Sequence, residues 1–488
     1  MAKVQKKALI SVSDKTGLLD FSRVIAQQFE ILSTAGTFQL LSNEGISVQK
    51  IEDYTGIPEL LGGKVKTLHP KIFAGILCVE ESDLIPAIRL VVVNLYPVGK
   101  KEIDIGGAAL LRAAAKNYEN VVVVCDPNDY EEVGRKLGIG QIDCRFRKAL
   151  AAKAFRLTAA YDAAIASSME ENFFPAQLTL SFTKLRELAY GENPSSRAVL
   201  YLNGKEGGDS AATATQLQGK PLSYNNVLDA DAALELVKKF SQPACAIIKH
   251  NNPCGVAIKE NACRAFIEAF EADPLCAFGG VVAFNCCVDL ETAEAMRKRF
   301  FDLVIAPDYE KKALEILGGK KNLRVLKTGA ISSSNLRQTV FKEVAGGLLV
   351  QTNEPFVIQE EDCRVVTDKK PSEAQIQELL FAAKVNEEVK SNSSVIARDG
   401  IAVGVGAGQM SRIDSVFLAL RKAKERAKGA VLSSDGFFPF ADSIESAAEA
   451  GITAIIQPGG SKKDQEVIEA CNRNGIAMIF TGKRLFKH

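Results

Sequence analysis

The sequence predicts an α/β protein built on parallel sheets that are covered by helices. Short apolar runs of strand length alternate along the chain with longer segments whose apolar residues recur at helical spacing. Strands that alternate with helices form parallel sheets with helices on both faces. The length of 488 residues, 47% of them hydrophobic, corresponds to about three domain-sized cores.

The alternation is clearest in the first part of the chain. The first two predicted strands end in turns rich in serine and threonine, and each turn leads into a segment of helical periodicity. We expect this first domain to span residues 1–180, followed by a polar and aromatic joint. The predicted strands are residues 7–12, 30–32, 90–95 and 121–125, and the predicted helices include residues 18–29 and 147–170.

The rest of the chain has a different pattern of predicted strands and helices. From about residue 185 the strand-like runs are separated by longer helices, and near residues 352–359 they give way to polar sequence. We therefore predict two further domains, 185–355 and 356–488. No repeat of fixed period is evident. The predicted strands are residues 245–248, 280–284, 303–306 and 394–397, and an alanine-rich helix is predicted at 371–389.

Composition and charge exclude several classes of protein. Lys and Arg total 60 against 59 Asp and Glu, so a net charge of +1 provides no basic field for nucleic acid. The apolar runs are too short to cross a membrane, and the start of the chain resembles neither a signal peptide nor a transit peptide. The eleven cysteines are scattered and odd in number, which favours reduced thiols. We expect a cytoplasmic protein with no nucleic-acid or membrane partner.

The same composition predicts no metal site. There are three histidines, His69, His250 and His488, which are far apart in the sequence, and there is no C-x-x-C pair. A zinc site needs several such ligands at close spacing. Cys286 and Cys287 are adjacent, but neighbours on a strand point to opposite faces, and small buried thiols are the better interpretation.

Two hydroxyl-rich turns in the first domain indicate an anion site. One runs from Ser11 to Gly17 with Lys15 among the hydroxyls, and the other runs from Ser33 to Thr37. Hydroxyls and main-chain N–H groups at a helix N-terminus bind phosphate, although the same residue types are also ordinary helix caps. Because neighbouring parallel strands present both turns at one edge of the sheet, we expect them to converge on one phosphate.

Three further segments of this domain place polar or charged residues at the ends of elements. Lys64 and Lys66 alternate and so point the same way in an extended chain. Asn-Leu-Tyr-Pro follows a strand at residues 94–97, and Asp104 precedes a glycine turn, with Lys116 about three helical turns further on. The alternative interpretation of Lys64 and Lys66 is a solvated basic edge. For Asp104 and Lys116 the alternatives are a plain helix cap and a surface salt bridge.

In this order, the segments resemble those of a bifunctional purine biosynthesis family whose first domain is an inosine monophosphate (IMP) cyclohydrolase. They are SVSDKTG at 11–17, the turn at 33–37, GGKVKTLHPKI at 62–72, VVNLYP at 92–97 and IDIGG…RAAAKN at 103–117. The rest of the chain resembles the fused partner, the aminoimidazole carboxamide ribonucleotide (AICAR) transformylase. Its segments are YGENP at 190–194, LSYNN at 222–226, KHNNP at 249–253, AFGG at 277–280, GAGQMSR at 406–412, SDGFFPF at 434–440, QPGGS at 457–461 and RLFKH at 484–488.

The resemblance covers essentially the whole chain and implies a fold for each domain. The first is expected to be methylglyoxal-synthase-like, and the other two are expected to be cytidine-deaminase-like α/β lobes without the zinc. The absence of the H-x-E and C-x-x-C motifs of the zinc deaminases agrees with this expectation. By the same analogy we expect a homodimer whose transformylase sites are built from both subunits.

The first implied reaction transfers a formyl group from 10-formyltetrahydrofolate to AICAR and gives formyl-AICAR (FAICAR). An aromatic amine must lose a proton while an oxyanion is stabilised. Lys249 and His250 follow an apolar strand and suit these two tasks, although the sequence does not assign one task to each, and a chance surface pair is the plain alternative. By resemblance Asn392 orients the reacting groups. The nucleotide is expected at Tyr190, Asn226, Asp302, Phe437 and Arg484, and the folate at Phe278, Gly279 and Asp442.

The second implied reaction closes the ring of FAICAR to give IMP with loss of water. It is intramolecular, so positioning does most of the work. By resemblance Lys66, Tyr96, Asp104 and Lys116 are catalytic, and Asp104 and Lys116 handle protons and the oxyanion. No cofactor is expected to be permanently bound, since 10-formyltetrahydrofolate is a cosubstrate. The phosphate is expected in a cradle formed by Ser11, Ser13, Lys15, Thr16, Thr34, Gly36, Thr37, Lys64 and Thr67.

Three positions depart from the family pattern. Ala189 stands where the family has the arginine that grips the transformylase nucleotide, and two serines follow the proline of the same motif. Ala35 stands where a glycine is usual in the phosphate turn, which would strain the backbone if that position required a positive φ. Phe73 replaces a histidine.

These departures leave three hypotheses for the function. The first is a working bifunctional enzyme, the second a cyclohydrolase with a weakened transformylase half, and the third a nucleotide-binding protein that has lost catalysis. A protein that only binds nucleotide has no need of a Lys-His pair. The third hypothesis is therefore disfavoured by the joint presence of Lys66, Asp104, Lys116, Lys249, His250 and Asn392.

Overall fold

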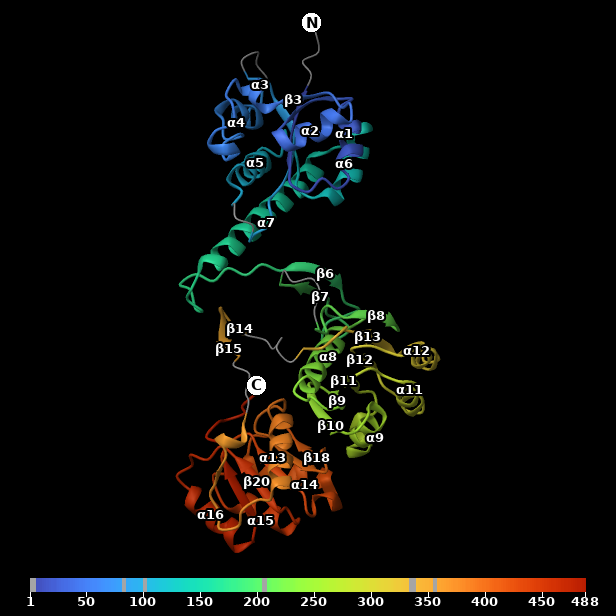
Figure 1. Cartoon of the computed structure of the whole chain (residues 1–488), viewed down its shortest axis with the longest axis vertical. Coiled ribbons are helices and arrows are strands. Elements are labelled where there is room, and N and C mark those ends of the chain that lie inside the picture. The colour runs from blue at the N-terminus through green and yellow to red at the C-terminus, as the bar shows by residue number, and fades with distance from the viewer. Residues whose placement is uncertain (1–5, 81–84, 100–102, 204–208, 333–338, 354–357) are drawn as a thin grey trace. The chain divides into compact units, whose positions relative to one another are not determined.

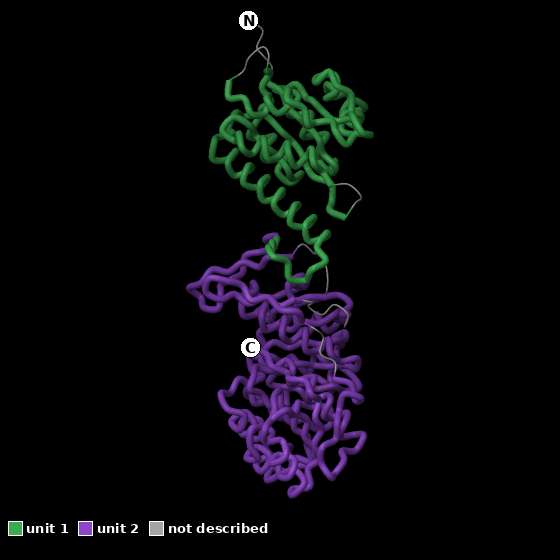
Figure 2. The backbone as a smooth tube through the Cα atoms, turned by 90° about the vertical axis from the view of Figure 1, so that its left-hand side faces the viewer, with its two compact units in different colours: residues 1–181 green, residues 182–488 purple. Residues whose placement is uncertain are grey.

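The computed structural model describes residues 6–80, 85–99, 103–203, 209–332, 339–353 and 358–488. The chain forms two compact units, residues 1–181 and residues 182–488 (Figure 2). Among the described residues, no helix combines the length and the apolar character needed to cross a membrane.

The first unit contains one five-stranded sheet in which every pair of neighbouring strands is parallel (Figure 1). The strand order is β3-β2-β1-β4-β5, so the first strand lies in the middle. The strands are β1 (Lys6–Val12), β2 (Phe29–Ser33), β3 (Val48–Lys50), β4 (Ile88–Asn94) and β5 (Val122–Val124). The helices are α1 (Leu18–Ile25), α2 (Ala35–Asn43), α3 (Ile51–Thr55), α4 (Pro70–Leu77), α5 (Ile105–Lys116), α6 (Tyr130–Gly138) and α7 (Cys144–Met169).

This sheet confirms the predicted parallel α/β organisation of the first domain. Leu90, Val91, Val92 and Val93 of β4 are all buried. Because successive strand residues point to opposite faces, both faces of the sheet are covered. The prediction of a helix over 18–29 was wrong at its end: α1 stops at Ile25 because the chain turns there and enters β2 four residues later.

The second unit contains a twelve-stranded mixed sheet with the order β16-β21-β20-β19-β17-β18-β10-β9-β11-β12-β13-β8. Two separate hairpins, β6–β7 (Thr183–Glu187, Val199–Leu202) and β14–β15 (Thr339–Val344, Gly347–Thr352), accompany it. The strands of the large sheet are β8 (Thr215–Gln218), β9 (Ala244–Lys249), β10 (Asn252–Ile258), β11 (Val281–Phe284), β12 (Leu303–Ala306), β13 (Arg324–Lys327), β16 (Arg364–Val365), β17 (Ser394–Arg398), β18 (Ile401–Gly406), β19 (Val431–Ser434), β20 (Ala454–Gln457) and β21 (Ala477–Phe480).

The two halves of this sheet repeat one order of elements. Each half begins with a short edge strand, β8 or β16, continues with a helix and an antiparallel hairpin, and then adds parallel strands that alternate with helices. The halves meet where β10 pairs with β18. The helices are α8 (Tyr224–Val237), α9 (Ala262–Ala272), α10 (Pro274–Ala277), α11 (Leu290–Arg297) and α12 (Lys311–Gly318) in one half, and α13 (Glu373–Asn386), α14 (Arg412–Ala423), α15 (Asp442–Glu449) and α16 (Asp464–Arg473) in the other.

Glycines let a helix approach the central hairpin strand closely in both halves. A Cβ on Gly255 of β10 would lie 1.8 Å from the carbonyl oxygen of Ala269 in α9, and one on Gly406 of β18 would lie 1.9 Å from that of Ser415 in α14. Any side chain at either position would force the helix away from the sheet. The repeat is therefore one of packing as well as of element order, although the sequence has no evident period.

The predicted domain boundary between residues 355 and 356 lies outside the described residues. The hairpin β14–β15, just before that boundary, was not anticipated from the sequence. Its Phe341, Val344, Leu348 and Leu349 are exposed by 41–58% of their surface. An isolated two-stranded hairpin is marginally stable in water, so these apolar residues are unusual for a free surface.

Candidate active sites

In the first unit the two hydroxyl-rich turns lie side by side. The turns follow β1 and β2, which are neighbouring parallel strands. The hydroxyl oxygens of Ser11 and Thr34 are 3.1 Å apart. The Lys15 ammonium donates to the hydroxyl of Thr37 at 2.6 Å and also to the carbonyl of Val12. The structure thus brings together four of the residues expected to hold phosphate.

Lys15 and Gly36 have surroundings suited to an anion. Burial lowers the pKa of Lys15, because a charged ammonium is poorly solvated there. A Cβ built on Gly36 would meet nothing within 4 Å, so space is open beside the start of α2. Ala35 is the first residue of that helix and is not among the described residues with a positive φ. Its departure from the family pattern therefore causes no backbone strain.

Asn94, at the end of β4, fixes the first turn and was not predicted as a site residue. Its side-chain oxygen accepts from the N–H groups of Ser13 at 2.6 Å and Asp14 at 2.9 Å, and its amide donates to the Asp14 carbonyl at 3.0 Å. The Ser13 hydroxyl also donates to Asn94 and to Leu95. Thr16 is held within the turn by its N–H bond to Asp14 at 2.9 Å. The signal was present in the Asn-Leu-Tyr-Pro segment, whose asparagine we did not single out.

A second cluster lies at the N-terminus of α5. Asp104 caps this helix by accepting from the Gly107 N–H at 2.6 Å. Burial raises the pKa of Asp104, while the N–H of Gly107, the backbone of Tyr96 and the charge of Lys66 act in the opposite direction. The Thr67 hydroxyl oxygen lies 2.7 Å from where a Cβ on the helix residue Gly106 would stand. Lys66, Thr67, Tyr96 and Asp104 are thus neighbours, as the resemblance implies.

Glu59 joins this cluster, and two expected residues do not. The Glu59 carboxylate lies 3.3 Å from the Lys66 ammonium, a pairing that the sequence did not reveal. Lys116 is exposed at the last residue of α5. The twelve residues of this helix separate it from Asp104 by about 18 Å at 1.5 Å per residue. Lys64 is likewise exposed, and no described contact joins Lys64 or Lys116 to the others.

In the second unit, Lys249 and His250 lie at the hairpin that joins β9 to β10. Lys249 pairs with Asn252 across the ladder, which leaves His250 and Asn251 as the two loop residues. Their φ angles are 52° and 60°. The Lys249 ammonium donates to the Phe278 carbonyl at 2.7 Å. Lys249, which is expected to be catalytic, is therefore in contact with the segment expected to bind folate, Phe278 and Gly279.

Helix α8 supports this hairpin with residues on its first turns. The Asn251 N–H donates to the Asp229 carboxylate at 2.8 Å. Burial raises the pKa of Asp229, the N–H groups of Asn251 and His250 and the charge of His250 lower it, and Asp302 raises it further. Asn226, one turn earlier, accepts from the Ser223 N–H and hydroxyl in a capping box. Asp229, which was not predicted, thus bonds to the hairpin and is influenced by the charges of His250 and Asp302.

Tyr190 adjoins the start of the same helix. Its carbonyl accepts from the Tyr224 N–H at 3.0 Å, and the Ala189 N–H donates to the Leu222 carbonyl at 2.8 Å. Ala189 itself is exposed. A longer side chain at this position therefore has room to extend.

Asn392 is held by a buried arginine that was not predicted. Its side-chain oxygen accepts from the Arg412 guanidinium at 2.7 Å, and its amide donates to the Gln409 carbonyl at 3.0 Å. Arg412 also donates to the Ser393 carbonyl at 2.9 Å and forms an ion pair with Asp435, which is fully buried. Charge-assisted bonds of this kind are strong and directional, so Asn392 is fixed in one orientation.

The C-terminal tail lies against the same loop. The Arg484 guanidinium lies 5.8 Å from the centre of the Phe437 ring, and the Ser391 N–H donates to the Lys487 carbonyl at 2.9 Å. The Lys487 ammonium pairs with Glu388. Burial alone would raise the pKa of Glu388, but the charges of Lys239 and Lys487 lower it to about 2. The structure thus gathers Asn392, Phe437 and Arg484.

Asn252 joins these two groups of residues. Its amide donates to the His250 carbonyl at 3.0 Å, and its side-chain oxygen accepts from the Lys390 N–H, also at 3.0 Å. Asp442, the remaining expected folate residue, is the first residue of α15, and its carboxylate accepts from the neighbouring Ser443 N–H at 2.7 Å. No described contact joins Asp442 to Phe278.

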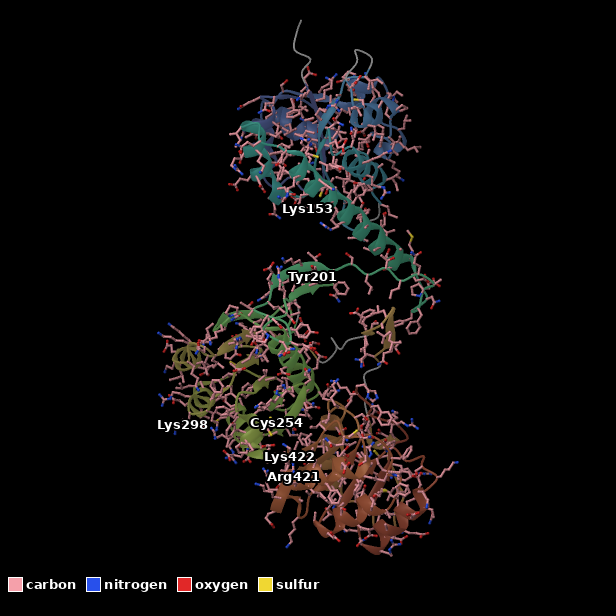
Figure 3. All side chains as sticks on the ribbon, turned by 180° about the vertical axis from the view of Figure 1, so that it is seen from behind. Lys153, Tyr201, Cys254, Lys298, Arg421 and Lys422 are labelled. Atoms are coloured by element: carbon pink, nitrogen blue, oxygen red, sulfur yellow. The ribbon has the colours of Figure 1, made fainter. Side chains whose placement is uncertain are left out.

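Lysines fix other segments near these residues. Lys422 of α14 pairs with Asp273 and lies 3.1 Å from the Cys276 sulfur, which anchors α10 directly before Phe278 (Figure 3). In the first unit, Lys153 of α7 pairs with Asp126 at 2.7 Å and Asp129 at 2.8 Å. Both clusters are ordinary ion pairs that hold a helix to a neighbouring loop.

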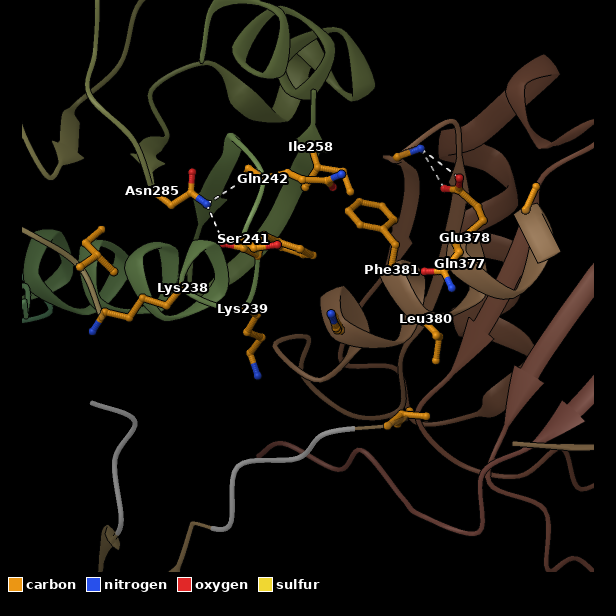
Figure 4. Close-up of a pocket in the computed structure, with 16 residues that line it drawn as sticks. Lys238, Lys239, Ser241, Gln242, Ile258, Asn285, Gln377, Glu378, Leu380 and Phe381 are labelled. Carbon is orange, nitrogen blue, oxygen red and sulfur yellow. Dashed lines mark hydrogen bonds between the residues drawn. The ribbon is translucent and has the colours of Figure 1, made fainter. Parts of the chain in front are cut away.

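A cavity of about 960 Å³ lies between α8 and α13. Figure 4 shows Phe381 and Glu378 on one side of it and Gln242 and Asn285 on the other, with Asn285 bonded to backbone carbonyls and Glu378 to a backbone N–H. No residue expected in either active site lines this cavity.

Comparisons with known proteins agree along the whole chain. A family model described as "AICARFT/IMPCHase bienzyme" matches residues 114–422, and one described as "MGS-like domain" matches residues 18–122. The "Bifunctional purine biosynthesis protein PurH" of Oceanobacillus iheyensis is 45% identical over 99% of this chain and 100% of its own. The protein of the same name from Brucella anthropi is 46% identical over 99% of this chain and 97% of its own.

Among solved structures, one titled "Crystal structure of ForH" is 36% identical over 33% of this chain and 95% of its own, with a TM-score of 0.32. The MGS-like match confirms the expected fold of the first domain. The likeness of the later lobes to cytidine deaminase stays a prediction.

The ion pair that holds the C-terminal tail predicts a pH-dependent contribution to stability. Because the pKa of Glu388 is lowered from 4.5 to about 2 in the folded protein, its contribution is fully present above pH 4.5 and is lost as the pH falls toward 2. Glu388→Gln is expected to lower the free energy of unfolding by about 3 kcal/mol at pH 7. The measurement is denaturant unfolding of both proteins at pH 7 and at pH 3, where the difference should be much smaller.

An exposed glutamate provides the control. Glu466 pairs with Lys463 at the surface, so Glu466→Gln is expected to leave the free energy of unfolding close to the wild-type value at either pH. A Glu388→Gln deficit that stays constant from pH 7 to pH 3 would contradict the proposed charge stabilisation.

Proposed function

The chain belongs to the AICARFT/IMPCHase bienzyme family, and from this we propose how its two units divide the work. It is a bifunctional enzyme of purine biosynthesis that acts as AICAR formyltransferase and IMP cyclohydrolase. The observation that carries this conclusion is the match to bifunctional relatives over almost the full length of the chain. The division of residues between the two reactions is our proposal.

Formyl transfer is assigned to the second unit. The amine nitrogen of AICAR attacks the formyl carbon of 10-formyltetrahydrofolate, a new C–N bond forms, and the bond from that carbon to the folate nitrogen breaks. One proton leaves the amine and one reaches the released folate nitrogen. His250 takes the amine proton, and Lys249 stabilises the oxyanion or protonates the folate nitrogen. The contact of Lys249 with the Phe278 carbonyl supports this placement beside the folate.

Ring closure is assigned to the first unit. The carboxamide nitrogen of FAICAR attacks the new formyl carbon, and water leaves as the ring becomes aromatic. Asp104, whose pKa burial raises, is suited to exchange a proton with the substrate, and Lys66 lies beside it to stabilise the oxyanion. The hydroxyls around Lys15 hold the phosphate, and so orient the intramolecular attack. Lys116 is not part of this cluster in the described chain.

The cosubstrate, assembly and location complete the proposal. We propose 10-formyltetrahydrofolate as the cosubstrate, with no permanently bound cofactor, and a cytoplasmic location. A homodimer is supported by the hairpin β14–β15, whose Phe341, Leu348 and Leu349 are too apolar for a surface left in water. The alternative of a weakened transformylase half rests on Ala189.

One pair of variants tests the division of labour. Lys249→Ala should abolish formyl transfer and leave ring closure of supplied FAICAR unchanged, because the two sites lie in different units. Lys66→Ala should do the reverse and let FAICAR accumulate from AICAR. Both are measured by following FAICAR and IMP by mass, with spontaneous ring closure subtracted. Wild-type formyl transfer by Lys249→Ala would remove the assigned transformylase site, and wild-type ring closure by Lys66→Ala would remove Lys66.

Restoring the missing arginine tests the second hypothesis. Ala189→Arg adds one charge-assisted phosphate contact, worth about 1.5–3 kcal/mol, and should tighten AICAR binding by roughly one to two orders of magnitude. Isothermal calorimetry with AICAR measures it, and Ala189→Gln provides an uncharged side chain of similar reach. Equal affinity in all three proteins would show that another residue already fills this role.

A further inference from the structure

The hairpin that carries His250 has a demanding backbone. A two-residue loop that matches the twist of its strands needs a positive φ at both loop residues, and glycine, asparagine and aspartate are favoured there. His250 and Asn251 have φ angles of 52° and 60°. A left-handed conformation is unfavourable for a residue with a Cβ, because the Cβ approaches the following carbonyl oxygen. Histidine at this position therefore needs support from its surroundings.

Asp229 of α8 supplies that support from below the loop. Its carboxylate accepts from the Asn251 N–H at 2.8 Å, and the main chain of His250 lies close enough to lower the pKa of the Asp229 carboxyl. Bonds from main-chain N–H groups to a carboxylate are stronger than bonds between neutral groups. On the far side of the loop, Asn252 donates to the His250 carbonyl at 3.0 Å. The loop is thus held at the Asn251 N–H and at the His250 carbonyl.

The second half of the sheet contains the same arrangement without the catalytic residues. There the hairpin β17–β18 has Asp399 and Gly400 in its loop, with φ angles of 56° and 70°. The carboxylate of Glu378 accepts from the Gly400 N–H at 3.0 and 3.1 Å, a contact drawn in Figure 4. Asp229 is the sixth residue of α8 and Glu378 the sixth residue of α13. The fold therefore uses this acid-to-loop contact twice.

The two hairpins distinguish the residues that the loop conformation favours from the residues that the proposed reaction requires. Asp-Gly is a favoured pair for such a loop, so the second hairpin meets the backbone demand with its own residues. The first hairpin has His-Asn at the equivalent place, which suits the backbone less well and supplies an imidazole. From these contacts we propose that Asp229 is a positioning residue for formyl transfer, which holds the His250 backbone so that the imidazole points at the substrate. This inference rests on the proposed function.

The test compares the two acids. Asp229→Ala should lower kcat for formyl transfer by about 100-fold, the effect of a misplacement of about 1 Å, with little change in the KM for AICAR. Glu378→Ala removes the matching contact and should leave that kcat close to the wild-type value. Ring closure of supplied FAICAR should be unchanged in both variants, and because that reaction is assigned to the first unit, thermal unfolding compared with the wild type shows whether the second unit is folded. Where Asp229→Ala does not fold, Asp229→Asn replaces it, with an expected loss of about tenfold for the lost charge.

A rescue experiment separates positioning from general packing. Glycine adopts a positive φ more readily than any residue with a Cβ, asparagine included, so Asn251→Gly should lower the cost of the loop conformation and reduce its dependence on Asp229. Added to Asp229→Ala, it should raise kcat about tenfold, which corresponds to about 1.4 kcal/mol. Added to the wild-type protein, it should leave formyl transfer close to the original rate.

The outcomes are distinguishable. Wild-type kcat in Asp229→Ala, an equal loss in Glu378→Ala, or no recovery with Asn251→Gly would each overturn the inference. If Lys249→Ala also retained full formyl transfer, the proposed site itself would be wrong. If Lys249→Ala is inactive while Asp229→Ala is fully active, only the positioning role is lost.

Discussion

Main-chain groups at the ends of strands need partners, and both candidate sites depend on the side chains that provide them. Where a strand ends, N–H and C=O groups lose their ladder bonds, and each must be paired again or left to solvent. Asn94 accepts from two N–H groups of the first turn, Asp104 caps α5, and Asp229 accepts from the Asn251 N–H of the hairpin β9–β10. The side chains that hold these loops also fix the direction in which the reactive groups point.

Partial burial gives the same polar groups their chemical character. Burial raises the pKa values of Asp104 and Asp229 and lowers that of Lys15, while nearby N–H groups or charges limit the shift for the two acids. An acid poised closer to neutrality exchanges protons more readily, which suits Asp104 to ring closure. Asp229 has a similar environment but faces main-chain groups, so we assign it to positioning. Burial alone does not distinguish proton exchange from positioning. The groups that each acid contacts distinguish the two roles.

The sequence predicts the parallel sheet from its local pattern of apolar residues. It also predicts that the two hydroxyl-rich turns meet, because parallel strands end at one edge of the sheet. The supporting residues do not follow from that pattern, because their partners are distant in sequence. Asn94 bonds to a residue 81 positions away, and Asn252 to one 138 positions away. The repeat in the second unit is not evident in the sequence, because its two halves share backbone φ angles and close packing but not residue types. One hairpin loop is His-Asn and the other is Asp-Gly. The residues expected by resemblance included Lys116, which helix length separates from Asp104.

One time course tests the central claim most directly. Purified protein is mixed with AICAR and 10-formyltetrahydrofolate, and FAICAR and IMP are followed by mass. The account predicts that IMP forms at a rate that depends on the enzyme, with FAICAR as the precursor, so that both units work in one chain. If neither product forms, and FAICAR supplied directly is not converted faster than it closes spontaneously, the protein only binds nucleotides and the account is wrong.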